Sequence, residues 1–318
     1  MRWWLMLIVL WVSPIVGAQE FPIRGLRIVV PFGPGTGSDV LARSVAAKMA
    51  EQMGQPVTVE NREGAGGLIG ARAVLSSPAD GYTLLLAANP FVVNPLMHVK
   101  PPYDVQRDFT PLAKVAVVPN ILIVAPATQA ATLRELIALA RARPGQLNYA
   151  SSGKGTPSQL ETELLMADFE FSMQEVAYKS TAQAMTDLIG GQVDVYYPTL
   201  PAALPHIKSG RVRALAVGAP ARLSALPSVP TVTEALGSPG YEAQTWYGFV
   251  VAAATPIAAV NRLRAEIVKA MQSPEVRTRT DALGAEVLNV NADNFARQLR
   301  ADSQKWGKLI DRLGLRAE

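Results

Sequence analysis

Two glycine-rich segments of the sequence carry small hydroxyl residues in a pattern suited to binding an anion. They span residues 31–39 and 151–158, and each lies between a strand-forming run and a helical stretch. Glycine lets backbone amides converge at such a turn, and the positive end of the helix dipole favours negative charge. The residues expected to contact a ligand are Gly35, Thr36, Gly37, Ser38 and Asp39, together with Ser152, Lys154, Gly155, Thr156 and Ser158.

Some of these residues allow a second interpretation. Asp39 could complement the helix dipole without touching a ligand. Lys154 either supplies a counter-charge for a second negative group or points to solvent. A further glycine turn at residues 64–67 serves either packing or the same site. If the first two segments face each other across a cleft, a dicarboxylate would bridge them.

The elements that must position these segments are strands and helices in alternation. Short apolar runs followed by amphipathic stretches predict parallel sheets covered by helices. Capping boxes predict helix starts at Thr132, Thr156, Ser180 and Thr231. The predicted strands are 27–30, 57–60, 83–87, 121–125, 147–150, 175–178, 193–197, 212–217 and 248–252.

The first 18 residues predict a cleaved signal peptide. Arg2 precedes an apolar run at residues 3–12, and Pro14 and a small-residue stretch ending at Ala18 follow. The run is shorter than the roughly 20 residues that span a bilayer, so we expect no stable membrane anchor. We therefore expect a periplasmic protein that begins at Gln19. The chain has no cysteine, which excludes disulfides, thiolate metal sites and a lipid anchor at the cleavage point.

Composition and motifs argue against several other classes. The net charge is +4, with basic and acidic residues interspersed, so nucleic acid is not expected as a partner. The Gly33–Gly37 pattern resembles a dinucleotide fingerprint, with Glu60 as the ribose-binding acid, but it lacks the final glycine. There is no GxSxG motif, and His98 and His206 are the only histidines, so neither a hydrolase nor a metal site is expected. The sequence favours a binding protein without cofactor over an oxidoreductase or an interaction protein.

The sequence from Ile28 to the C-terminus resembles the Bug family, also called TctC-like. These are the periplasmic solute-binding receptors of tripartite tricarboxylate transporters. The resemblance rests on an ordered set of short segments, none of which is decisive alone. They lie at 30–39, 59–67, 80–85, 94–95, 102–104, 108–109, 147–151, 177–179, 190–194, 204–210, 213–217, 226–231 and 246–248.

The resemblance implies an α/β protein with the type II periplasmic-binding-protein fold. Two α/β lobes would enclose a ligand cleft, with chain crossings near Val124 and Gln244. Residues 19–123 and 245–318 would form the first lobe, and residues 124–244 the second. By their positions in the family's pattern, further cleft residues would be Ala88, Asn89, Tyr178, Tyr197 and Thr199.

The resemblance also implies how the protein would work. Backbone amides and hydroxyls would hold a small carboxylate, lobe closure would follow, and no catalysis would occur. The expected partners are membrane transporter subunits or a sensor kinase, with the receptor itself a monomer. This sequence has Lys154 where the family often has asparagine, Gln159 where histidine is common and Pro198 where aspartate is common. The last change disfavours amino-acid ligands, but the choice among carboxylates, and between transport and sensing, stays open.

Overall fold

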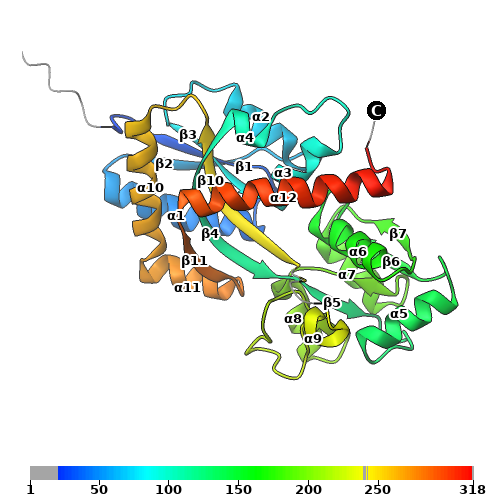
Figure 1. Ribbon diagram of the computed structural model, residues 1–318. Coiled ribbons are helices and arrows are strands. Elements are labelled where there is room, and N and C mark those ends of the chain that lie inside the picture. The colour runs from blue at the N-terminus through cyan, green and yellow to red at the C-terminus, as the bar shows by residue number, and fades with distance from the viewer. Residues whose placement is uncertain (1–20, 239–240, 242, 317–318) are drawn as a thin grey trace, which may run out of the picture.

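The protein consists of two α/β lobes, each built on its own β-sheet (Figure 1). The computed structural model describes residues 21–238, 241 and 243–316. The strands are β1 (Leu26–Val30), β2 (Val57–Asn61), β3 (Thr83–Ala88), β4 (Phe109–Pro119), β5 (Ile121–Val124), β6 (Asn148–Ser151), β7 (Gln174–Ala177), β8 (Val195–Tyr196), β9 (Arg213–Val217), β10 (Gln244–Ala252) and β11 (Glu286–Val290). The first lobe has a six-stranded sheet in the order β11-β4-β10-β3-β1-β2, and the second a five-stranded sheet in the order β7-β6-β8-β5-β9. The predicted α/β fold class is confirmed.

Helices connect most of these strands and cover both sheets. None of the helices in the described part of the chain is long and apolar enough to cross a membrane. The helices are α1 (Gly37–Met53), η1 (Ala65–Gly67), α2 (Leu68–Leu75), α3 (Asn89–Leu96), α4 (Val105–Asp108), α5 (Leu133–Ala142), α6 (Pro157–Asp168), α7 (Thr181–Ile189), α8 (Leu200–Lys208), α9 (Val232–Leu236), α10 (Ile257–Met271), α11 (Pro274–Ala282) and α12 (Ala292–Leu313).

All nine predicted strands are present, whereas β4 and β11 were not predicted. β4 contains prolines at 111 and 119 and a lysine at 114, so it shows no clean alternation. Its pairing with β10 is interrupted by register shifts, which accommodate these residues. The local sequence pattern therefore does not predict a long strand that is stabilised by its pairing with neighbouring strands.

The predicted helix caps have mixed outcomes. Thr231 forms a complete capping box, and the side chains of Thr132 and Ser180 accept hydrogen bonds from the third helical amide. The helix start predicted at Thr156 is confirmed, because Thr156 is the N-cap residue of α6, but its side chain makes no capping hydrogen bond. Its hydroxyl instead donates to the carbonyl oxygen of Gly153 at 2.7 Å. The Thr156 hydroxyl is therefore used within the loop before α6 and does not cap the helix.

The chain passes from one sheet to the other at Asn120, between β4 and β5. It returns at Ala243, and the amide of Asn120 donates to the carbonyl oxygen of Ala243 at 3.1 Å. Val124, near which we expected the first crossing, is the last residue of β5. The extended chain runs almost directly from β4 into β5, so no turn residue marks the crossing in the sequence.

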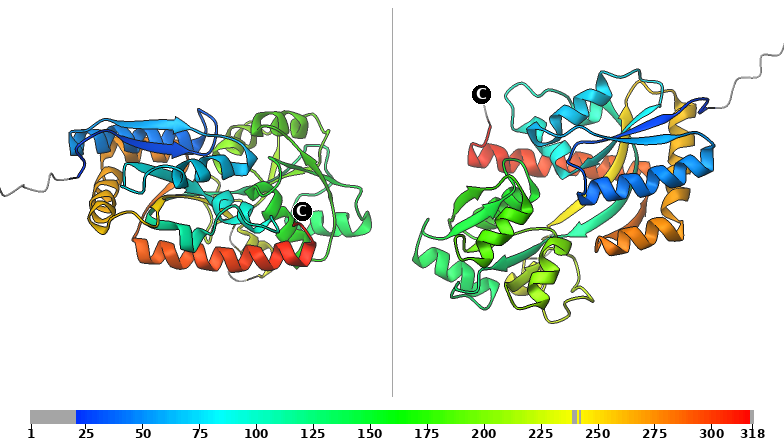
Figure 2. Two further views of the ribbon diagram at one scale, coloured as in Figure 1. Left: turned by 90° about the horizontal axis from the view of Figure 1, so that it is seen from above. Right: turned by 180° about the vertical axis from the view of Figure 1, so that it is seen from behind.

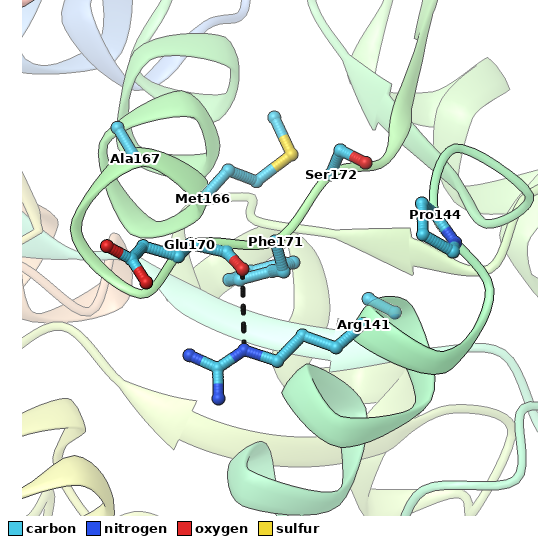
Figure 3. A pocket seen from close by; sticks show the side chains of 8 residues that line it. Arg141, Pro144, Met166, Ala167, Glu170, Phe171 and Ser172 are labelled. Carbon is cyan, nitrogen blue, oxygen red and sulfur yellow. Dashed lines mark hydrogen bonds between the residues drawn. The ribbon is translucent and has the colours of Figure 1, made fainter.

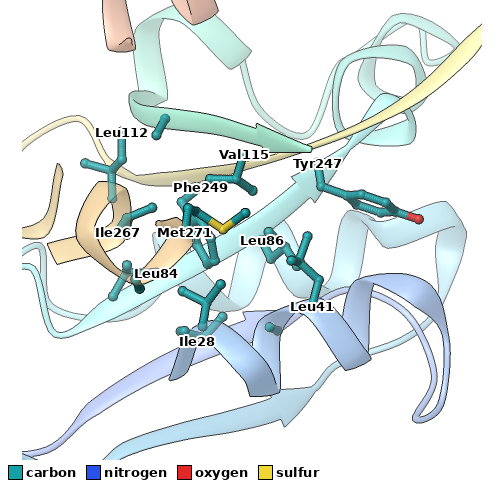
Figure 4. Close-up of a cluster of buried hydrophobic side chains, with 14 of the residues drawn as sticks. Ile28, Leu41, Leu84, Leu86, Leu112, Val115, Tyr247, Phe249, Ile267 and Met271 are labelled. Atoms are coloured by element: carbon teal, nitrogen blue, oxygen red, sulfur yellow. The ribbon is translucent and has the colours of Figure 1, made fainter. Parts of the chain in front are cut away.

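Aliphatic side chains fill the space between the first sheet and the helices on one of its faces (Figure 4). Ile28, Leu86 and Phe249 from the strands pack in one cluster with Leu41 of α1 and Ile267 of α10. Each of these five side chains is at most 1% exposed. This packing fixes α1, and with it the glycine-rich loop that precedes α1.

The C-terminal helix α12 extends along one side of both lobes (Figures 1 and 2). Near its start, Phe295 packs edge-on against Trp246 in the first lobe. Further along, Trp306 shares a buried cluster with Leu160 of α6 in the second lobe. α12 is therefore a non-covalent link between the lobes, in addition to the two crossings.

Two glycines test how tightly α12 packs. A methyl group added at Gly248 of β10 would come within 2.4 Å of the Phe295 ring, whereas one added at Gly307 of α12 would meet nothing within 4 Å. We expect Gly248→Ala to lower the free energy of unfolding by about 1–3 kcal/mol through overpacking. Gly307→Ala should raise it by up to about 1 kcal/mol through helix propensity. Urea unfolding measures both; equal effects would contradict the described packing.

Candidate ligand-binding site

A cleft of about 820 Å³ lies between the lobes, within the size range of small-molecule sites. Its walls come from the loops at the carboxyl ends of β1, β2 and β3 in the first lobe and of β6, β7 and β8 in the second. Among the described residues that line it, only Glu63 and Lys179 carry charged side chains. The cleft is therefore mostly uncharged in its side chains.

Six of the described helices begin at this cleft. Residues at the first turn or cap of α1, α2, α3, α6, α7 and α8 line it. The first amides of a helix have no partner within the helix, and the helix dipole places positive charge at that end. Six such ends around one space create a positive potential from the main chain alone, which suits a carboxylate.

The two glycine-rich loops repeat one pattern of sequence and hydroxyl bonding. Each reads Gly-x-Gly-Thr-x-Ser, at residues 33–38 and 153–158. The Thr36 and Thr156 hydroxyls donate to the carbonyl oxygens of the first glycine, at 2.8 and 2.7 Å. Each threonine also lies within hydrogen-bond distance of the serine two residues on, at 3.0 and 3.2 Å. These four hydroxyl side chains all line the cleft.

The residue after each serine stabilises the second glycine of its loop. The Gly35 amide donates to the Asp39 carboxylate at 3.0 Å, and the Gly155 amide donates to the Gln159 side-chain oxygen at 2.7 Å. Gly35 and Gly155 have φ values of 79° and 73°, a region that glycine adopts without strain. Asp39 and Gln159 therefore fix the loops from behind.

Asp39 is buried and fully occupied by protein donors. Besides Gly35, it accepts from Nε of Arg43 at 3.0 Å and from Nδ2 of Asn61 at 2.9 Å. Burial alone would raise the pKa of the Asp39 carboxyl, but the bonds from Arg43, Gly35 and Asn61 together lower it below its ordinary value. Asp39 is not among the residues that line the cleft, so the structure supports its positioning role.

Ten of the predicted site residues line the cleft: Gly35, Thr36, Gly37, Ser38, Ala88, Ser152, Thr156, Ser158, Tyr197 and Thr199. Asn89, Lys154, Gly155 and Tyr178, like Asp39, do not line it. Lys154 is exposed. Asn89 binds the main chain of β10 through Gln244 and Trp246.

The remaining two residues, Tyr178 and Gly155, make contacts within the protein. The Tyr178 hydroxyl interacts with Asp187, and burial and this bond raise its pKa to about 12. A methyl group at Gly155 would overlap the side chain of Asn94, so this glycine is needed for close approach of α3 to the loop. Neither role can be read from the local sequence.

Several lining residues were missed at the sequence level. They include Lys179 between β7 and α7, Tyr247 of β10, and Asn120 and Thr245 beside the crossings. The Tyr247 hydroxyl lies behind Gly37, and burial raises its pKa to about 12, so it is neutral. The repeated Gly-x-Gly-Thr-x-Ser pattern was the available signal that the two loops form one site.

A second, smaller pocket in the second lobe has a different character (Figure 3). It lies where α5 and α6 end, and Arg141 beside it donates to the main-chain oxygens of Phe169 and Glu170. Arg141 thus satisfies carbonyls at the C-terminal end of α6, a structural role. Within the described residues, no group of three or more His, Cys, Asp or Glu side chains could hold a metal ion.

The fold and the cleft define a two-lobed solute-binding protein, and sequence comparison identifies which kind. A sequence model described as "Tripartite tricarboxylate transporter family receptor" matches residues 41–315. The chain therefore belongs to this receptor family, as its resemblance to Bug and TctC proteins indicated, and it is a receptor and not an enzyme.

Individual relatives agree with this assignment. Protein BugT of Bordetella pertussis is 36% identical over 94% of this chain and 92% of its own. A protein of R. palustris solved with adipate has a TM-score of 0.82 and 33% identity, over 93% of this chain and 99% of that one. MatC of Rhodopseudomonas palustris, with bound malate, has a TM-score of 0.80 and 31% identity, over 91% and 100%.

Replacing Asp39 tests its role behind the first loop. Asp39→Asn should lower the free energy of unfolding at pH 7 by about 1–3 kcal/mol, because Arg43 loses its buried partner. The lowered pKa means that the carboxylate stabilises the fold above pH 4 and ceases to do so as the pH falls through the pKa of the folded state. The difference between wild type and variant should therefore shrink toward pH 3 in urea titrations.

The exposed Asp311, paired with Arg316 at 2.8 Å, provides the control. Asp311→Asn should cost less than about 1 kcal/mol at either pH. An Asp39→Asn effect that does not change with pH would contradict the charged role of Asp39.

Proposed function

We propose that this receptor captures a small carboxylated solute in the interlobe cleft. The observation that supports this is the convergence of six helix N-termini on a cleft with one lining cation among the described residues. Main-chain amides and the hydroxyls of the repeated loops would hold the carboxylate. Backbone donors at a helix start are a recurrent anion site, and a cleft of this size admits a molecule of several carbons.

We further propose a dicarboxylate as the preferred ligand. Relatives have been solved with adipate and with malate, both of which carry two carboxylates. In this chain Lys179 follows β7, the strand farthest from the hinge strand β5 on that side of the sheet. A carboxylate at the glycine loops would leave the outer part of the cleft, with Lys179, for a second acid group.

The biological setting is proposed on the same basis. The predicted signal peptide, residues 1–18, lies outside the described residues, and we propose that its removal leaves a free periplasmic receptor. Binding would draw the two lobes together around the solute, and the closed form would present both lobes to a membrane partner. That partner would be a transporter of the tripartite tricarboxylate type, or a sensor that reports the solute.

Calorimetric titration of the chain from Gln19 onward tests the proposed ligand class. Malate, adipate, monocarboxylates, amino acids and nicotinamide cofactors are compared at one pH. We expect a dicarboxylate to bind. At a concentration a hundred times its dissociation constant, it should raise the free energy of unfolding by roughly 2.7 kcal/mol. Binding of a cofactor or a neutral solute with no response to any acid would refute the proposal.

Two lysines near the same loops form a matched pair for the second acid group. Both lysines are exposed, but Lys179 lines the cleft whereas Lys154 does not. Lys179→Ala should weaken dicarboxylate binding about tenfold, equivalent to about 1.4 kcal/mol, and monocarboxylate binding less. Lys154→Ala should leave both unchanged. Equal losses from the two variants would show that Lys179 does not contact the second carboxylate.

A further inference from the structure

A buried carboxyl group lies at the hinge, outside the set of residues that line the cleft. Glu161 of α6 is 1% exposed. Its Oε2 atom accepts a hydrogen bond from Nδ2 of Asn120 at 2.6 Å. The cation whose charge acts on it is Lys305 of α12. A carboxyl group in such a place is costly to keep charged, so its presence at the hinge calls for a reason.

The contacts of Glu161 join α6 to both crossings. Asn120 belongs to the first crossing, and its Oδ1 atom accepts from the Thr245 hydroxyl at 3.3 Å, just beyond the second. The Tyr241 hydroxyl, also beside the second crossing, donates to the main-chain oxygen of Glu161 at 3.1 Å. Asn120 and Thr245 both line the cleft. One residue of α6 thus contacts the hinge from two sides.

The same helix carries part of the candidate site. α6 begins directly after Thr156, and Thr156 and Ser158 line the cleft. Glu161 lies one turn further along this helix. Any shift of α6 relative to Asn120 would therefore move the second glycine-rich loop relative to the first lobe.

The surroundings of Glu161 favour its neutral form near neutral pH. Burial raises its pKa to about 8, although the bond from Asn120 and the charge of Lys305 act in the opposite direction. The groups that face it from neighbouring segments, Tyr197 and Tyr241, are buried and neutral because burial raises the pKa of both. Ionisation would place a negative charge at the hinge, one turn from the cleft that attracts an anion.

We propose that Glu161 is a positioning residue whose protonated carboxyl is buried between α6 and Asn120. Ionisation makes this burial costly, so that α6 and the second glycine-rich loop move away from the hinge and solute affinity falls. The effect on affinity rests on the proposed function, whereas the effect on the hinge does not. If the ionised form does not bind, the dissociation constant at pH 9 should be about tenfold higher than at pH 7.

The hinge effect is tested without any ligand. Because the chain has no cysteine, Lys208→Cys and Lys269→Cys provide one exposed spin-label site in each lobe. We expect the distance distribution between the labels to broaden or lengthen between pH 6.5 and pH 9. A distribution that does not change with pH in the otherwise wild-type protein would overturn the proposal, whether or not any variant folds.

Two variants of α6 test whether the pH response comes from Glu161. Glu161→Gln keeps a neutral acceptor for Asn120, so its label distances and its malate and adipate affinities should not change from pH 6.5 to 9. Glu163→Gln is the matched control, because Glu163 is also partly buried with a raised pKa but accepts from Tyr149 instead of the hinge. This variant should retain the wild-type pH response. Loss of the response in Glu163→Gln, or its persistence in Glu161→Gln, would refute the assignment.

Unfolding provides an independent measurement. The pKa of Glu161 is higher in the folded than in the unfolded state, so its contribution to stability is complete below about pH 4.5 and is lost as the pH rises to about 8. The advantage of wild type over Glu161→Gln in urea unfolding should decrease across that range. If malate and adipate fail to bind at any pH, the ligand class is wrong, while the distance and unfolding measurements still decide the role of Glu161.

Discussion

The arrangement of the whole molecule depends on the hydrogen bonds of one buried residue, Asn120. Its amide binds the carbonyl of Ala243 and its carbonyl accepts from Gly218, so both chain crossings meet at its main chain. Its side chain binds Thr245 and Glu161. Together with the packing of α12 on both lobes, these bonds fix the relative placement of the two sheets, and hence the shape of the cleft.

Each lobe contributes the same local structure to the cleft. A parallel strand ends in a Gly-x-Gly-Thr-x-Ser loop, a helix begins, and a side chain behind the loop, Asp39 or Gln159, holds the second glycine. The two loops differ in the charge behind them, because Asp39 forms an ion pair with Arg43 whereas Gln159 donates a hydrogen bond to Glu175. The hydroxyls that face the cleft are similar, while their support differs from lobe to lobe.

Much of this could be predicted from sequence, and the failures have physical causes. Local sequence predicts the strands before both loops, because strand patterns are local. It also predicts the hydroxyl residues of the cleft, because turns and helix starts are local; these are Thr36, Ser38, Thr156 and Ser158. β4 could not be predicted, since its prolines and lysine are tolerated only through irregular pairing with β10. Lys179 and Asn120 line the cleft because of the order of the strands in the second sheet, which the local sequence does not reveal. Asp39 and Gly155 do not line the cleft, because the carboxylate of the first and the amide of the second bind within the protein, and the sequence does not reveal such partners.

The helix starts around the cleft carry an implication for how this receptor tolerates mutation. The positive potential at these ends comes from peptide groups that every amino acid except proline supplies, so it survives most replacements of the surrounding side chains. The side chains at the outer part of the cleft are therefore free to change the shape and length of the solute that fits. On the proposed function, a scaffold of this kind can diverge in specificity by single substitutions without first losing its hold on the carboxylate.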